Sequence, residues 1–246
     1  MKKSKQSKLD ALLKVEFTME DSLWLSSGYT LRRLVGILGM ALPLLLFFFL
    51  YLDSGLIKPL PSISHYYFTR VSGIFLIILG TTGIFLMVYK GHKPIDFYIS
   101  LFAGLFALVL LLFPTSNLAV KCCDPDKTYT VTYLKDIDIR AVIHYISAAI
   151  FLLCLAYMSL FLFTKSNLPP AHRGAKKRIR NRIFRTCGVI IFLSIIVILL
   201  GFLEIIPPEV YDKCQMTFWM ETIAVESFGF SWLIKGRTLF KDKSKS

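Results

Sequence analysis

Six polar residues interrupt or border the most apolar parts of this chain, and they are the residues best suited to bind a ligand. Two of them, His65 and His144, are histidines, which ligate metals and exchange protons near neutral pH. The others are a phenol, a cation and two carboxylates: Tyr66, Arg70, Glu221 and Glu226. Ionisable groups are costly in apolar surroundings and usually have a partner there, so these six residues form the predicted ligand pocket.

Three of the six have the donor types of a zinc site. Two histidines and one carboxylate, here His65, His144 and Glu221, could hold a metal that activates water for hydrolysis at the lipid headgroup level. The chain lacks a local HExxH spacing, and each donor comes from a different part of the sequence. Two other interpretations stay open. In the first, these side chains are structural hydrogen-bond partners; in the second, they line a pocket that binds a lipid, small molecule or ion without catalysing a reaction.

Helix geometry limits how the two glutamates can act together. At about 100° per residue, the five-residue step from Glu221 to Glu226 places them about 140° apart around a helix axis. We therefore expect Glu221 to meet the histidines and Glu226 to face another neighbour, such as a Ser or Tyr of an adjacent segment.

The elements that must position these residues are six apolar stretches. A helix needs roughly 20 apolar residues to cross a bilayer core of about 30 Å. The stretches therefore predict an all-α, single-domain bundle of six transmembrane helices, with Glu221 and Glu226 inside the last one. They cover about 34–52, 71–89, 97–117, 141–164, 186–206 and 214–234.

The distribution of cations predicts the orientation of the bundle. Of the 29 Lys and Arg residues, 22 fall in the segment before residue 34, in alternate connections and in the tail. Because basic loops stay on the cytoplasmic side, residues 1–33 and 237–246 are predicted to be cytoplasmic. The three remaining connections then face outward, together with the predicted pocket. This arrangement also gives the net charge of +13 a topological cause and excludes nucleic acid as a partner.

Two basic segments predict membrane lipids as partners of the protein. The loop that contains Arg173 to Arg185 could hold anionic lipid headgroups, although positive-inside bias alone also accounts for it. In the segment 1–33, apolar residues recur at helical spacing among lysines. This pattern predicts an interfacial helix, with a surface for a soluble partner as the alternative: Leu9, Leu12, Leu13 and Phe17.

Cysteines and glycines give further structural predictions. Cys122 or Cys123 in the long outer loop could form a disulfide with Cys214, and a site of three outer thiols for a metal is the alternative. Cys154 and Cys187 lie inside apolar stretches and are predicted to pack as small apolar residues. Glycines in the second stretch predict close helix packing: Gly73, Gly80 and Gly83.

Short motifs give the chain a resemblance to a known family. A Pro-Ser-Ile-Ser segment at Pro61 precedes the second stretch, Asp96 precedes the third, His144 begins a run with small residues, and Glu221 lies in the last. On these motifs, residues 34–236 resemble the six-span DRAM/FRAG-type membrane proteins and related bacterial proteins of unknown function. The resemblance implies a compact six-helix bundle without cofactor chemistry and supplies no catalytic residues. The long Cys-containing outer loop and the strongly basic inner loop depart from the family pattern.

The functional expectation is a non-enzymatic integral membrane protein that binds a lipid or small ligand, or senses membrane state, through the outward-facing pocket. An intramembrane lipid hydrolase with zinc at the same residues is the alternative, and a channel or transporter subunit is a further one. Compact loops favour a cell membrane of bacterial type, the inner membrane. Formation of a homo-oligomer stays open.

Overall fold

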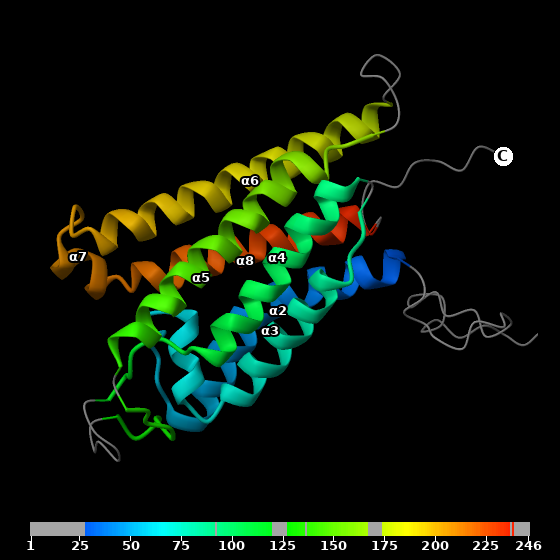
Figure 1. Cartoon of the computed structure of the whole chain (residues 1–246). Coiled ribbons are helices and arrows are strands. Elements are labelled where there is room, and N and C mark those ends of the chain that lie inside the picture. Colours follow the sequence, from blue (N-terminus) through cyan, green and yellow to red (C-terminus); the bar gives the residue numbers. More distant parts are fainter. Residues whose placement is uncertain are drawn as a thin grey trace, which may run out of the picture.

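In the computed structural model, residues 28–91, 93–119, 127–135, 137–166, 174–236 and 238 are described. Within these ranges every regular element is a helix (Figure 1). In chain order the elements are α2 (Gly28–Ser54), the 3₁₀ helix η2 (Ile63–Phe68), α3 (Ser72–Met87), α4 (Pro94–Leu112), α5 (Asp138–Tyr157), the π-helical turn η4 (Met158–Leu162), α6 (Ala175–Phe202), α7 (Pro208–Lys213) and α8 (Met216–Lys235).

Local sequence signals set where the helices begin. Pro94 stands at the first position of α4, where a missing N–H costs nothing. Two residues later, Asp96 accepts a hydrogen bond from the backbone N–H of Lys93 at 3.2 Å and so caps the helix start. By contrast, α2 continues through Pro43, which lies inside a 27-residue helix.

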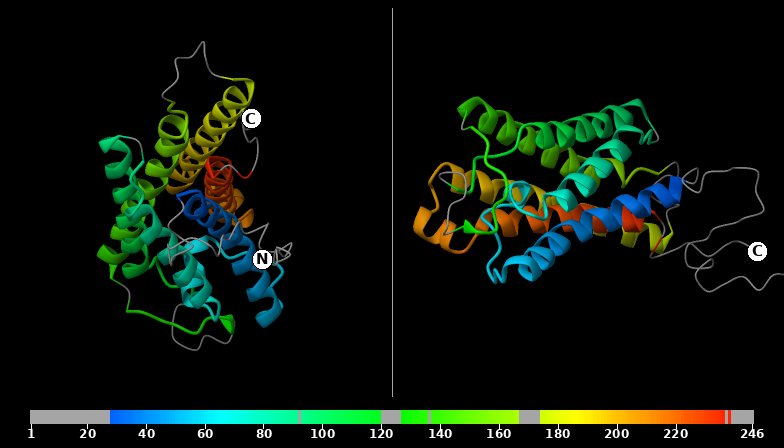
Figure 2. Two further views of the ribbon diagram at one scale, coloured as in Figure 1. Left: turned by 90° about the vertical axis from the view of Figure 1, so that its right-hand side faces the viewer. Right: turned by 90° about the horizontal axis from the view of Figure 1, so that it is seen from below.

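The long helices form a closed ring. Each of α2 to α6 packs against the next long helix along the chain, and α8 packs against both α6 and α2. Figures 1 and 2 show α8 lying between α2 and α6. Consecutive helices run in alternating directions, so η2, α7 and the start of α5 gather at one end of the bundle. We call this the η2 end; the starts of α2, α4 and α6 lie at the opposite end.

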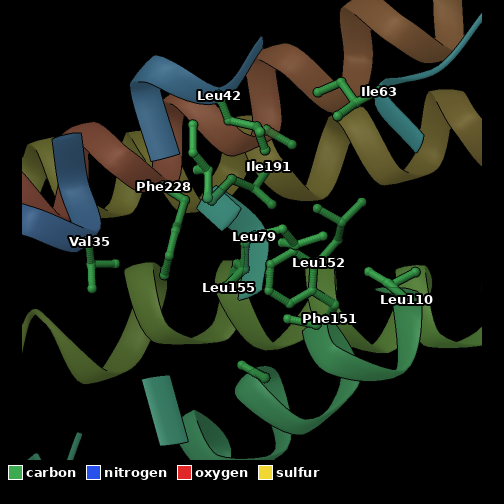
Figure 3. Close-up of a cluster of buried hydrophobic side chains, with 14 of the residues drawn as sticks. Val35, Leu42, Ile63, Leu79, Leu110, Phe151, Leu152, Leu155, Ile191 and Phe228 are labelled. Atoms are coloured by element: carbon green, nitrogen blue, oxygen red, sulfur yellow. The ribbon is translucent and has the colours of Figure 1, made fainter. Parts of the chain in front are cut away.

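Apolar side chains from all parts of the ring meet in its centre (Figure 3). Leu42 of α2, Leu155 of α5 and Ile191 of α6 are each at most 4 % exposed. Ile63 of η2 belongs to the same cluster, which ties the short helix to the bundle.

The outer surface of the bundle is also apolar. Large apolar side chains such as Leu44, Ile77, Leu112 and Phe202 are more than half exposed. Such surfaces are typical of helices whose solvent is lipid, because a soluble domain rarely exposes contiguous apolar area on this scale. The chain is therefore a helical membrane protein.

Four described helices are long and apolar enough to cross a membrane: α2, α4, α5 with η4, and α6. The helix α3 is apolar but has 16 residues, and α8 has 20 residues with two glutamates inside it. The all-helical prediction is confirmed. The count of six crossings stays a prediction, and so does the inward orientation of both termini.

Glycines allow two helix pairs to approach closely. A Cβ atom added at Gly36 of α2 would lie 2.8 Å from the carbonyl oxygen of Gly229 in α8. In the second stretch, Gly83 packs against Gly104 of α4, as predicted. Gly73 does not support the prediction, because nothing lies within 4 Å of a Cβ atom at that position.

Candidate functional site

The carboxylate of Glu221 joins α8 to the start of η2. Its two oxygens accept hydrogen bonds from the hydroxyl of Ser62, at 3.0 and 2.8 Å, and one also accepts the backbone N–H of Ile63 at 2.7 Å. A second bond runs nearby between the two segments, from the backbone N–H of Phe218 to the carbonyl of Pro61 at 3.0 Å. Glu221 thus receives donors from the N-terminal turn of a short helix, where a negative charge is favoured.

Ser62 has two roles at this junction. Besides donating to Glu221, its hydroxyl accepts the backbone N–H of Ser64 at 3.0 Å, and it is the N-cap of η2. The carbonyl of Ser62 accepts the backbone N–H of His65 at 3.2 Å. His65 therefore lies one 3₁₀ turn beyond the Glu221 contact, on a segment held in place from both sides.

His144 is buried in the first half of α5, with 3 % of its surface exposed. Its Nδ1 lies 2.8 Å from the carbonyl oxygen of Phe113, beyond the end of α4. A carbonyl can only accept, so Nδ1 carries the proton and the lone pair of a neutral ring is on Nε2. This is the tautomer in which a second-shell carbonyl orients a histidine for a ligand.

His65 has a buried nitrogen with an unmet hydrogen bond. Its Nδ1 has no hydrogen-bond partner among the described residues. Burial, followed by charge repulsion from a protonated His144 and from Lys127, lowers the pKa of His65 to about 4, so its ring is neutral at pH 7. Lys127 itself donates to the carbonyl of Leu118. This effect on His65 indicates that His144 and Lys127 lie within electrostatic range of its ring, and we call the three residues the histidine cluster.

The remaining predicted pocket residues have different surroundings. Tyr66 is fully buried with its ring 6.0 Å from that of Phe218, and burial raises its pKa to about 12. Arg70 is exposed and lies 3.6 Å from Asp53, away from the buried groups. Glu226 is partly buried and has no hydrogen bond within the described part of the chain, so the predicted bond to a Ser or Tyr is not formed there.

The predicted zinc ligands do not gather as a metal centre. Among the described residues, no three His, Cys, Asp or Glu side chains form a group that could hold a metal. The reason is visible in the contacts, because Ser62 and Ile63 occupy the carboxylate of Glu221. His144 lies within electrostatic range of His65, whereas Glu221 holds η2.

The cysteine predictions are tested only in part. Cys122 and Cys123 lie outside the described residues, and so does the predicted interfacial helix before residue 28. Cys214 is exposed at the end of α7. Cys187 is buried in α6 and Cys154 is half-buried in α5, which agrees with a packing role.

A second polar cluster lies at the opposite end of the bundle. Asp96, 2 % exposed, forms an ion pair with Lys165, which follows η4 in the chain. The carbonyl of Lys165 accepts a hydrogen bond from Lys177 of α6 at 3.1 Å. Lys235 of α8 donates to the carbonyl of Phe163 at 3.3 Å. Sequence reasoning noted Asp96 as a motif residue but not its partner, which is 69 positions away.

Comparison of the chain with protein-family models, with curated proteins and with solved structures finds no match. The class of the protein therefore follows from its own fold: a helical membrane protein with a polar cluster at each end of the bundle. The resemblance to the DRAM/FRAG-type proteins stays a prediction.

Proposed function

We propose that this chain is a non-enzymatic, multi-pass membrane protein that binds a lipid or small ligand at the histidine cluster. The observation that supports this proposal is the buried Nδ1 of His65, which has no hydrogen-bond partner among the described residues. Leaving a buried polar group unpaired costs about 1–3 kcal/mol. A polar ligand group would recover that free energy on binding.

The chemistry of the cluster indicates the kind of ligand group. His144 in its neutral form presents a lone pair on Nε2, and Lys127 adds a positive charge nearby. A group that combines an O–H or N–H donor with a negative or carbonyl oxygen would satisfy both rings and the cation. Polar lipid headgroups and small metabolites carry such groups. In the predicted orientation the cluster faces outward, where occupancy by a lipid would let the protein sense the state of the membrane.

Binding without catalysis has more support than hydrolysis. A hydrolase would need a third metal ligand or a free carboxylate base close to the histidines. Both oxygens of Glu221 already share the hydroxyl of Ser62, and one of them also accepts the N–H of Ile63. Its interactions are those of a structural carboxylate.

The test is native mass spectrometry of the full-length protein, extracted from its membrane in mild detergent, together with elemental analysis of the same sample. His144→Asn is the informative variant, because the Asn amide can still donate to the Phe113 carbonyl while Nε2 is lost. Tyr145→Phe, one position on, is the matched control.

We expect the wild type and Tyr145→Phe to retain a bound organic molecule that His144→Asn loses, with no stoichiometric metal. A wild-type spectrum without any adduct would contradict the proposal, and so would an adduct that persists equally in His144→Asn. Stoichiometric zinc that is lost in His144→Asn would favour the hydrolase instead.

A further inference from the structure

An open groove of about 560 Å³ lies along the first half of α6, at the opposite end of the bundle from the histidine cluster. Its lining residues recur at intervals of three and four, so they share one face of the helix. They are three arginines, two smaller polar residues and two apolar residues: Arg178, Arg182, Arg185, Asn181, Thr186, Val189 and Ile190. All three arginines are exposed.

Asn181 is the second observation at this groove. It lines the groove although only 8 % of its surface is exposed, and its Oδ1 is buried with no hydrogen-bond partner among the described residues. Oxygen and nitrogen of an amide can exchange places by rotation about χ2, which would turn the N–H donors toward a bound anion. With its N–H donors turned to the groove, the Asn181 amide beside three guanidinium groups would suit a ligand with several acceptor oxygens.

The same face of α6 becomes apolar one turn beyond Arg185. Val189, Phe192, Leu193 and Leu199 are each 47–53 % exposed and continue the stripe toward the middle of the helix. At about 1.5 Å per residue, Val189 lies roughly 6 Å from Arg185 along the axis. The groove thus places cations directly next to a surface suited to hydrocarbon chains.

We infer that this groove binds the headgroup of an anionic glycerophospholipid. Its phosphate lies against the arginines and the amide of Asn181, while an acyl chain follows the stripe from Val189. Guanidinium groups hold phosphate through two parallel hydrogen bonds, which distinguishes this site from a general attraction of basic loops to a membrane. The continuous apolar stripe favours a lipid over a soluble anion. The site is also independent of the histidine cluster, so either proposal can fail alone.

The test is a titration of full-length protein in detergent with phosphatidylglycerol or phosphatidylcholine, followed by native mass spectrometry. We expect tighter binding of phosphatidylglycerol. The double variant Arg182→Gln/Arg185→Gln should lower that affinity tenfold or more and lower the affinity for the zwitterionic phosphatidylcholine by a smaller factor. The matched control Lys90→Gln/Lys176→Gln removes two exposed cations outside the groove and should change the affinity less than threefold.

Two variants keep the inference testable if the glutamine variant fails to fold. Arg182→Lys/Arg185→Lys retains the positive charge but loses the paired N–H donors of the planar guanidinium. It should still lower the affinity several-fold. Asn181→Asp is isosteric and places a carboxylate against the phosphate, so it should also weaken binding tenfold or more.

Equal losses in the groove variant and the control variant would overturn the inference, because diffuse attraction would then account for binding. Unchanged affinity in both the lysine variant and Asn181→Asp would overturn it as well. Competition by inorganic phosphate at the same concentration as the lipid would show a soluble-anion site and contradict the role of the apolar stripe.

Discussion

The carboxylate of Glu221 lies 2.8 Å from the hydroxyl of Ser62, although 159 positions separate the two residues. This contact joins α8, which completes the ring of helices, to the start of η2, the short helix that contains His65. It therefore couples the stability of the bundle to the geometry of the histidine cluster.

Replacing Glu221 should destabilise the protein. A buried donor left without a partner costs about 1–3 kcal/mol, and Glu221→Ala removes the acceptor of two donors, the Ser62 hydroxyl and the Ile63 N–H. We expect a clearly lower Tm in detergent. Glu221→Gln, which keeps one acceptor oxygen, should lie between the alanine variant and the wild type.

Glu226→Ala is the control for this prediction, since Glu226 lies five positions along the same helix and has no hydrogen bond within the described residues. Its Tm should stay within a degree or two of the wild type. Similar losses for both glutamates would show that charge burial in α8, rather than the Ser62 contact, determines stability.

Gly36→Ala should disturb the contact between α2 and α8. The added Cβ would lie 2.8 Å from the carbonyl oxygen of Gly229, and backbone cannot move aside as a flexible side chain can. Overpacking of this kind costs about 1–3 kcal/mol. Thermal unfolding in detergent measures the loss.

Gly73→Ala provides the matched comparison, because no atom lies within 4 Å of the new methyl group. Alanine also favours the helix by up to about 1 kcal/mol over glycine. Gly73→Ala should therefore be neutral or stabilising. A destabilised Gly73→Ala together with an unaffected Gly36→Ala would refute the helix packing described above.

Asp96 and Lys165 should show strong coupling in a double-mutant cycle. Removing one member of a buried ion pair costs about 3–5 kcal/mol, and replacing both members often costs much less. Asp96 is 2 % exposed, and it also caps α4 through Lys93. We expect Asp96→Asn and Lys165→Met each to lower the Tm, and the double variant to lower it by less than the sum. Strict additivity would mean that the pair contributes no interaction energy.

The stability of the wild type should fall as the pH is lowered from about 6.5 to 4. The folded protein holds the pKa of His65 at about 4, whereas an unfolded histidine titrates near 6.5, so the unfolded state binds more protons in this window. The stabilisation is complete above pH 6.5. At pH 5 the linked loss is on the order of 2 kcal/mol.

His65→Asn removes this titration but leaves His144 and Lys127, the two groups that face His65, unchanged. The variant should show a shallower decrease in Tm between pH 7 and pH 4.5 than the wild type. Parallel curves for the two proteins would show that other groups cause the acid destabilisation.

The sequence predicted the helices better than it predicted the contacts between them. Lengths of apolar runs are local properties, and the described helices cover each of the six predicted ranges in whole or in large part. The sequence also places His65 and His144 at the same predicted end of their segments, and in the structure His144 acts electrostatically on His65. Their convergence on one pocket stays a prediction.

The role of Glu221 was harder to predict. Helix arithmetic separated it correctly from Glu226, but only the tertiary fold brings the start of η2, rather than a histidine, to its oxygens. Arg70 was placed with the pocket because it is near His65 in sequence. The turn after η2 directs it instead to the surface beside Asp53.

The groove on α6 had a partial signal in the sequence. The basic run up to Arg185 was assigned to a loop, yet α6 begins at Ala175, so most of these cations are helical. Helical spacing would have aligned Arg178, Arg182 and Arg185. The Oδ1 of Asn181, which has no hydrogen-bond partner among the described residues, could not be found without the packing around it.

We expect the histidine cluster and the α6 groove to lie on opposite faces of a membrane, and labelling of single cysteines tests this most directly. In a variant with all five native cysteines replaced, Lys58→Cys reports on the connection before η2 and Lys176→Cys on the start of α6; both positions are exposed. We expect a membrane-impermeant maleimide to label Lys58→Cys in intact cells and Lys176→Cys only after permeabilisation. Labelling of both positions in intact cells, or the reverse pattern, would contradict this account.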